Sequence, residues 1–164
     1  MSADIVAHSR AVLSTHARSF RWAARFLPPS RRDDAAVIYA FCRMIDDIAD
    51  EAGAADEAEC ELQLLEGELC GETAPRPLAA AFLEVAARRD IDLRSALELI
   101  AGVRSDLGVV VVDSDAELMR YCYRVAGTVG LMMCGLLGVT DRAGHPHAID
   151  LGVAMQLTNI CRDV

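Results

Sequence analysis

Apolar residues recur at three- and four-residue intervals through most of the chain, and short stretches of glycine, proline and charged residues separate the segments that carry this pattern. The spacing is that of amphipathic helices. Caps and breakers predict helices over residues 4–26, 30–50, 55–70, 77–89, 92–106, 114–137 and 148–164. The run "GVVVV" at 108–112 is predicted to be a connector, because one β-branched run without a partner makes no sheet. The expected fold class is therefore all-α.

Composition fits a single helical domain over residues 1–164. The chain has 164 residues, of which 53% are hydrophobic and only 5% aromatic, enough to bury one core. The net charge of -9 argues against nucleic acid as a partner, because binding phosphate backbones needs clustered Lys and Arg. An anionic substrate would need the help of metal ions.

The six cysteines form no C-x-x-C pair and are expected to pack as small hydrophobes in a reducing cytoplasm. The first ten residues lack a basic region followed by an apolar run, so no signal peptide is expected. The longest uncharged run, residues 125–140, is shorter than the roughly 20 residues that span a bilayer and contains glycines. It is predicted to be a buried helix, and the expected location is cytoplasmic.

One polar stripe runs along the apolar helix predicted over 30–50. Tyr39, Arg43, Asp46 and Asp50 fall within an arc of about 60° at helical spacing, and Asp47 lies off it. Burying an unpaired carboxylate costs several kcal/mol, so Asp46 and Asp50 are expected to face a wet cavity, a cation, or both. Taken alone, "DDIAD" would favour an ordinary solvated face.

The last predicted helix has the same arrangement, with Gly152, Gln156, Asn159 and Asp163 on one otherwise apolar helix. Two such stripes are expected to face each other across a pocket. Oxygen ligands without nearby His or Cys favour a hard cation such as Mg²⁺, with Mn²⁺ as the alternative. A di-iron bundle is not favoured, because no histidine has a glutamate three residues before it.

Three segments carry a resemblance to a known family: "SFRWAARFLPPSRRDDAAVIYAFCRMIDDIADE", "YCYRVAGTVG" and "AMQLTNICRDV". From about residue 19 onward the chain resembles the squalene and phytoene synthase family, the head-to-head trans-prenyl transferases, and within it the bacterial phytoene synthases. The resemblance implies a prenyl-synthase helical bundle with two aspartate-rich motifs that bind Mg²⁺ and two prenyl diphosphates. It makes Asp46, Asp50, Asn159 and Asp163 the expected metal ligands.

The resemblance also implies roles for polar residues near the first motif. His16 and Ser19 match a region near the diphosphate pocket, although both also fit the polar face of an amphipathic helix. Arg43 matches an arginine that contacts diphosphate, and its fork of donors suits phosphate oxygens; an i,i+3 ion pair with Asp46 is the alternative. Tyr39 is expected beside the catalytic groups, or in the core.

Further substrate-contacting positions are expected in the second half of the chain: Tyr121, Gly127, Val129, Gly130 and Gln156. Glycine in a helix costs about 1 kcal/mol relative to alanine, so Gly127 and Gly130 should let something come close. A prenyl chain or a neighbouring helix would both satisfy that requirement.

The implied reaction joins two prenyl diphosphates with loss of pyrophosphate. Two geranylgeranyl diphosphates giving phytoene are the first choice, and squalene or hydroxysqualene synthesis from farnesyl diphosphate is the alternative. A non-catalytic assembly factor is a third reading, opposed by the retained aspartates. Long hydrocarbon substrates and products predict a peripheral association with the inner membrane.

Because the second motif in the family continues one turn beyond Asp163, the chain is expected to be an amino-terminal part of a longer enzyme. The family's carboxy-terminal helices are expected to be missing. The 164 residues alone are expected to be inactive.

Overall fold

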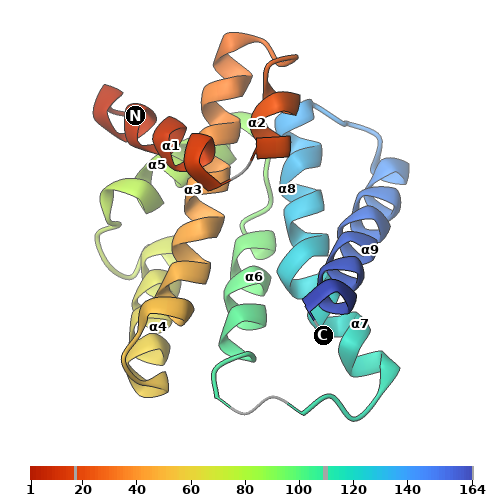
Figure 1. The fold of residues 1–164 in the computed structure, drawn as a ribbon. Helices are drawn as coiled ribbons and strands as arrows, with labels where there is room; N and C mark the ends of the chain where they lie inside the picture. The colour runs from red at the N-terminus through yellow and green to blue at the C-terminus, as the bar shows by residue number, and fades with distance from the viewer. Residues whose placement is uncertain (17, 109–110, 164) are drawn as a thin grey trace.

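The computed structural model describes residues 1–16, 18–108 and 111–163, without the side chains of residues 16, 18, 19 and 21. Over these residues the structure is all-α, as predicted, and has no strand (Figure 1). The elements are α1 Ala3–His16, α2 Arg18–Ala24, α3 Pro29–Glu51, α4 Ala55–Cys70, α5 Pro77–Arg89, α6 Arg94–Arg104, α7 Asp115–Cys122, the π-helical turn η1 Tyr123–Gly127, α8 Thr128–Leu137, the 3₁₀ turn η2 Arg142–Gly144 and α9 His145–Asp163.

Most predicted helix boundaries lie close to the observed ones, and those of α4 and α5 are confirmed at both ends. The α3 helix begins one residue before Ser30, with Pro29 at the first helical position. Proline is tolerated there because a backbone N–H at that position would have no hydrogen-bond partner within the helix. Asp92 lies just before α6 and accepts the backbone N–H of Arg94 at 2.9 Å. The α9 helix begins at His145, three residues earlier than predicted.

The single helix predicted over residues 4–26 is wrong. The structure describes α1 and α2 in this range, with Ala17 outside the described residues. Helical bonding ends at Ala24, because the following amides bond three residues back, Phe26 to Ala23 and Leu27 to Ala24, at 3.1 Å each. This tightened turn precedes Pro28, and a residue before proline is disfavoured in the α conformation.

The helix predicted over residues 114–137 forms with one irregularity. Its capped start is confirmed, because Ser114 Oγ accepts the N–H of Glu117 at 3.3 Å and the Glu117 carboxylate accepts the N–H of Asp113 at 2.9 Å. A π-helical turn, η1, separates α7 from α8. Thr128 donates its hydroxyl hydrogen to the Arg124 carbonyl at 2.6 Å within this widened segment.

The core forms around α3, which packs against α1, α4, α5, α6 and α8 (Figure 1). The rings of Phe41 and Phe82 stack with centroids 3.9 Å apart, and neither is exposed. Burying each such side chain stabilises the fold by about 1.5–3 kcal/mol. Nearby, the buried carboxylate of Asp34 accepts hydrogen bonds from Arg88 at 2.5 Å and Arg89 at 2.6 Å, which joins α3 to α5. A buried charge needs such partners.

Small residues allow α9 to lie directly on η1 and α8. A Cβ atom added at Gly130 would lie 2.3 Å from the Ala148 carbonyl oxygen, and one added at Gly152 would lie 2.4 Å from that of Ala126. Both clashes are with backbone atoms, which cannot move aside without separating the helices. The position of α9 therefore depends on these two glycines.

We expect Gly130→Ala to destabilise the protein by about 2 kcal/mol or more, because overpacking here must displace backbone. The matched control is Gly67→Ala within α4, where the nearest atom to the new Cβ lies 3.5 Å away. That control should raise stability by up to about 1 kcal/mol through helix propensity. Thermal unfolding followed by circular dichroism measures both changes, and an unchanged melting temperature for Gly130→Ala would contradict the packing described.

Candidate functional site

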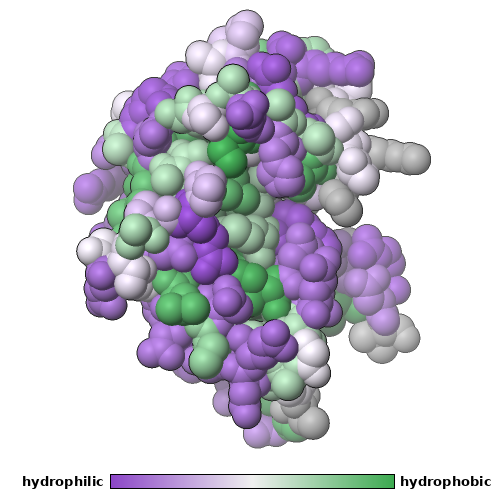
Figure 2. Space-filling model, turned by 90° about the vertical axis from the view of Figure 1, so that its left-hand side faces the viewer, coloured by the Kyte–Doolittle hydropathy of each residue, from purple (hydrophilic) through white to green (hydrophobic). Residues whose placement is uncertain are grey.

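Two hollows adjoin α3. The first, about 650 Å³, lies between α1, α3, α4 and the start of α5, and is called the α1–α4 groove. It opens on the face shown in Figure 2, where apolar residues are flanked by hydrophilic ones. The second, about 560 Å³, is called the carboxylate hollow, and its lining comes from α3, the residues before α4, the end of α6, α7, η1 and α9.

The carboxylate hollow brings together predicted residues from three helices. Asp46, Asp50 and Arg43 enter it from α3, Tyr121 from α7 and Gln156 from α9. The α3 residues meet there because they share one stripe of the helix, whose remaining circumference is largely packed in the core. α9 reaches the hollow by packing against η1 and α8. Residues from both predicted stripes thus line one polar hollow.

Asp46 has an unusual electrostatic environment. The residue as a whole is solvent-exposed, but its carboxyl group lies on the wall of the hollow, where protein atoms partly bury it. This burial, more than the charges of Asp50 and Asp47, raises the pKa of Asp46 to about 6, although Arg43 acts in the opposite direction. A bound cation would relieve the same unfavourable concentration of negative charge.

Arg43 pairs with a residue other than the one considered from the sequence. Its terminal nitrogen lies 2.6 Å from a carboxylate oxygen of Asp47 and 3.9 Å from one of Asp50, whereas no ion pair joins it to Asp46 among the described residues. Asp47 lines the α1–α4 groove rather than the carboxylate hollow, as its place off the stripe predicts. Arg43 Nε is buried and has no hydrogen-bond partner in the described structure.

Tyr39, Asn159 and Asp163 are predicted site residues that lie outside the carboxylate hollow. Tyr39 packs against Phe20 with ring centroids 5.8 Å apart, and its partial burial raises the pKa of its hydroxyl. Asn159 and Asp163 are exposed near the end of α9. Asp163 bonds Arg162 at 2.9 Å, and this bond lowers the pKa of Asp163. Only Gln156 of the second stripe lines the hollow.

Gly127, Val129 and Gly130 pack against other parts of the protein in this structure. A Cβ at Gly127 would lie 3.0 Å from Tyr123 and 3.2 Å from Ile149, and Val129 packs against the hydrophobic core. Together with the backbone contact of Gly130, these positions favour close helix packing over contact with a prenyl chain. The side chains of His16 and Ser19 lie outside the described residues.

Sequence reasoning missed Asp106, which follows α6 and lines the carboxylate hollow. Tyr121 donates its hydroxyl hydrogen to Asp106 Oδ2 at 2.8 Å, and burial together with this bond raises the pKa of Tyr121. One signal was available: a carboxylate just past a helix C-terminus opposes the helix dipole, and Asp106 occupies such a position. Its partner, fifteen residues away across a loop, was not foreseeable.

The cysteines differ from the sequence expectation in part. The described structure has all six free, and Cys122 and Cys134 are buried as expected, but Cys60, Cys70 and Cys161 are exposed. Burial, with a smaller contribution from Asp46, raises the pKa of the Cys42 thiol to about 12. A thiol with so high a pKa is a poor nucleophile at neutral pH.

The donor set of the carboxylate hollow fits a hard cation that is shared with a ligand. No three His, Cys, Asp or Glu groups among the described residues converge closely enough to form a metal site by themselves. Asp46 and Asp50 nevertheless lie one helical turn apart on the wall of the hollow. Mg²⁺ commonly takes one or two carboxylates and completes its shell with substrate phosphates and water.

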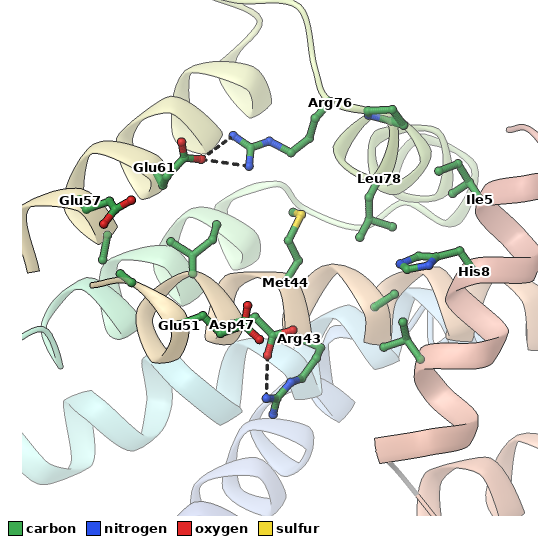
Figure 3. A pocket seen from close by; sticks show the side chains of 16 residues that line it. Ile5, His8, Arg43, Met44, Asp47, Glu51, Glu57, Glu61, Arg76 and Leu78 are labelled. Carbon is green, nitrogen blue, oxygen red and sulfur yellow. Dashed lines mark hydrogen bonds and ion pairs between the residues drawn. The ribbon is translucent and has the colours of Figure 1, made fainter. Parts of the chain in front are cut away.

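The α1–α4 groove offers fewer free groups (Figure 3). Arg76 lies 3.3 Å from Glu61 and 2.8 Å from Glu68, so its charge is neutralised within the protein. Arg43 also lines the groove, where it is paired with Asp47. Glu51 and Glu57 add negative charge, which disfavours an anionic ligand. The carboxylate hollow is therefore the better candidate.

Comparison with known proteins identifies similar sequences over nearly the whole chain. A family model described as squalene/phytoene synthase matches residues 13–164. The chain is 36% identical to a phytoene synthase of Pseudescherichia vulneris over 96% of its length and 55% of the relative's. It is 41% identical to a phytoene synthase of Thermus thermophilus, over 93% of this chain and 53% of the relative. It is 38% identical to a presqualene diphosphate synthase of Zymomonas mobilis, over 89% of this chain and 52% of the relative.

Solved structures agree with the expected prenyl-synthase fold. A dehydrosqualene synthase in complex with ligand superposes with a TM-score of 0.85 at 29% identity, covering 97% of this chain and 56% of that one. A squalene synthase from Alicyclobacillus acidocaldarius gives a TM-score of 0.78 at 25% identity, covering 95% and 60%. The chain spans about half the length of the relatives it matches. None of the described helices is long and apolar enough to cross a membrane.

The raised pKa of Asp46 predicts how stability changes with pH. Because the folded state binds this proton more tightly than the unfolded chain, the carboxyl favours folding below pH about 4, and that contribution is lost as pH rises through about 6. Asp46→Asn mimics the neutral acid. With EDTA present, the variant should melt at a higher temperature than the wild type near neutral pH, and this advantage should vanish near pH 4.

The matched control is Asp47→Asn, which removes the 2.6 Å pair with Arg43 and should bring no gain in stability. A lower melting temperature for Asp46→Asn than for the wild type at neutral pH would contradict the environment described for Asp46.

Proposed function

The chain belongs to the squalene/phytoene synthase family, and from that premise we propose that the carboxylate hollow binds the diphosphate of a prenyl substrate together with Mg²⁺. The observation that carries this proposal is the convergence of Asp46, Asp50, Arg43 and Gln156 on one hollow. The proposed reaction is the head-to-head condensation of two prenyl diphosphates with loss of pyrophosphate.

Asp46 and Asp50 would hold the metal ion through their carboxylate oxygens. Mg²⁺, or Mn²⁺ in its place, neutralises charge that develops on the departing pyrophosphate. Asn159 and Asp163 remain the proposed ligands from α9, and both are exposed near its end. The hydrogen bond that Asp163 accepts from Arg162 would have to break when Asp163 binds the metal ion.

Arg43 would contact the diphosphate directly. The terminal nitrogens of its planar guanidinium match phosphate oxygens. The bond to Asp47 holds the guanidinium in place before substrate arrives. Gln156 supplies a neutral amide on the opposite wall, and Tyr121 is oriented by its bond to Asp106. These groups bind and orient the leaving group, and no side-chain nucleophile is needed.

Geranylgeranyl diphosphate is the proposed substrate and phytoene the proposed product, because several relatives of 33–41% identity carry the name phytoene synthase. A presqualene diphosphate synthase at 38% identity favours farnesyl diphosphate as the second candidate. An assembly role without catalysis is opposed by the retention of both aspartates in the hollow.

A cytoplasmic protein that associates peripherally with the inner membrane is part of the same proposal. The substrate tails and the product are long hydrocarbons, whose transfer into water costs about 0.8 kcal/mol per CH₂ group. An enzyme close to a bilayer shortens or avoids that transfer.

We expect Asp46→Asn and Asp50→Asn each to lower turnover of the full-length protein by about two orders of magnitude or more, because each removes charge from the metal site. Asp47→Asn is the matched control, since it keeps the stripe intact and should lower turnover by less than about tenfold. Steady-state assays with saturating Mg²⁺ measure all three. Equal losses of turnover at the three positions would contradict the assignment of Asp46 and Asp50 to the metal site.

A direct assay decides between the two substrates. Full-length protein incubated with Mg²⁺ and geranylgeranyl diphosphate should yield phytoene, identified by mass spectrometry, while farnesyl diphosphate should yield little hydrocarbon. EDTA should abolish the product. If only farnesyl diphosphate is converted efficiently, the protein is a squalene-type synthase rather than a phytoene synthase. If neither substrate gives a product, the proposed reaction is refuted.

A further inference from the structure

Asp106 occupies a position that helix stability alone does not favour. It lies two residues beyond the last residue of α6, where the helix dipole disfavours negative charge. The nearest basic residue in the sequence, Arg104, does not compensate for it, because Arg104 pairs with Glu59 at 3.1 Å and Glu66 at 2.8 Å on α4. The hydrogen bond that the structure describes for the Asp106 carboxylate comes from Tyr121. This contact is therefore where a role for Asp106 is to be sought.

The hydrogen bond between Tyr121 and Asp106 has a defined direction. Tyr121 Oη lies 2.8 Å from Asp106 Oδ2. An ionised carboxylate can only accept, so the phenol supplies the hydrogen, and its oxygen keeps its lone pairs for other donors. Donation to a charged group also polarises the O–H bond and increases the negative charge on the phenol oxygen. Asp106 thus makes Tyr121 an acceptor toward anything else in the carboxylate hollow.

A second carboxylate in the hollow competes for the same hydrogen. Asp46 lines the hollow together with Tyr121 and Asp106. Burial contributes most to raising the pKa of Tyr121, Asp106 comes next, and Asp46 adds the smallest contribution. A tyrosine has one hydroxyl hydrogen, and here Asp106 accepts it. The Asp46 carboxylate therefore receives no hydrogen from Tyr121, and its oxygens remain available to a cation.

We propose that Asp106 is a positioning residue: it directs the hydroxyl hydrogen of Tyr121 away from Asp46, so that the phenol oxygen accepts from water on a metal ion in the hollow. The inference rests on the proposed function, because it requires a metal ion held by Asp46 and Asp50. Mg²⁺ commonly keeps several of its waters, and water polarised by a cation is a strong donor that needs acceptors nearby.

The alternative is that the bond merely ties the end of α6 to α7. The chain offers a matched control for this reading. Glu98 on α6 accepts from Arg124 Nε in η1 at 3.0 Å, and neither of these residues lines the carboxylate hollow. Glu98→Gln therefore weakens a tie of the same kind without changing the hollow.

The direction of the Tyr121 hydrogen bond is tested without substrate or metal. Full-length protein is labelled with ¹³C at the tyrosine Cζ, and the Tyr121 resonance is identified by its absence in Tyr121→Phe. In Asp106→Asn the measured pKa of Tyr121 should fall, because loss of a neighbouring negative charge favours the phenolate. Glu98→Gln should leave it unchanged. An unchanged pKa of Tyr121 in Asp106→Asn would overturn the proposal.

A double-mutant cycle tests the positioning role itself. Binding of Mg²⁺ together with inorganic pyrophosphate is measured by calorimetry on the full-length protein. Asp106→Asn and Tyr121→Phe should each weaken binding about tenfold, the factor expected for one hydrogen bond that involves a charged group. Because Asp106 acts through the Tyr121 hydroxyl, the double variant should bind no more weakly than Tyr121→Phe alone.

Two controls accompany the cycle. Glu98→Gln should bind Mg²⁺ and pyrophosphate as the wild type does. The melting temperature of Asp106→Asn should not fall, because the substitution also removes a charge that the α6 dipole disfavours. A weakening by Glu98→Gln equal to that by Asp106→Asn would show that the bond is only a structural tie.

The remaining outcomes separate this inference from the proposed reaction. Additive losses in the double variant would overturn the positioning role, because Asp106 would then act independently of Tyr121. If the wild type binds Mg²⁺ with pyrophosphate but makes no hydrocarbon, the proposed reaction fails, and the cycle still decides the role of Asp106. If the wild type does not bind them, both proposals fail.

Discussion

The burial of α3 on most sides is the constraint on which the rest of the structure depends. Its apolar residues contact five other helices, and stacking of Phe41 on Phe82 fixes its position relative to α5. A helix held in this way cannot rotate, and its open side leaves the Asp50 side chain 69% exposed. Asp46 and Asp50 must remain on the one stripe that the packing leaves open, and the rise in the pKa of Asp46 to about 6 is a consequence. The packing that stabilises the fold thus also fixes the position of both carboxylates.

The opposite wall of the hollow depends on a different kind of contact. Gln156 reaches the hollow only because α9 lies against η1 and α8, and that approach requires Gly130 and Gly152. Residues that touch no ligand therefore set the distance between the two walls. This explains why glycines are placed in helices at a cost of about 1 kcal/mol each: the cost is offset by close packing, and the packing positions a polar side chain.

The sequence predicts well those features that depend on local chemistry. The bounds of α4 and α5 follow from Gly71, whose positive φ ends one helix, and from Pro77, which begins the next. The grouping of Asp46 with Asp50 follows from helical periodicity alone. The end of helical bonding at Ala24, the π-helical turn η1 and the contact of Tyr121 with Asp106 depend on neighbours distant in the chain. Periodicity carries no information about them.

Negative charge is concentrated at the carboxy-terminal end of α3. Asp46, Asp47, Asp50 and Glu51 lie in its last two turns, and the last turn holds no basic residue, an arrangement that the helix dipole opposes. Packing energy can maintain such an arrangement, but helix stability alone would select the reverse. The arrangement makes physical sense if this end faces a counter-charge outside the protein. A cation shared with a diphosphate would supply it.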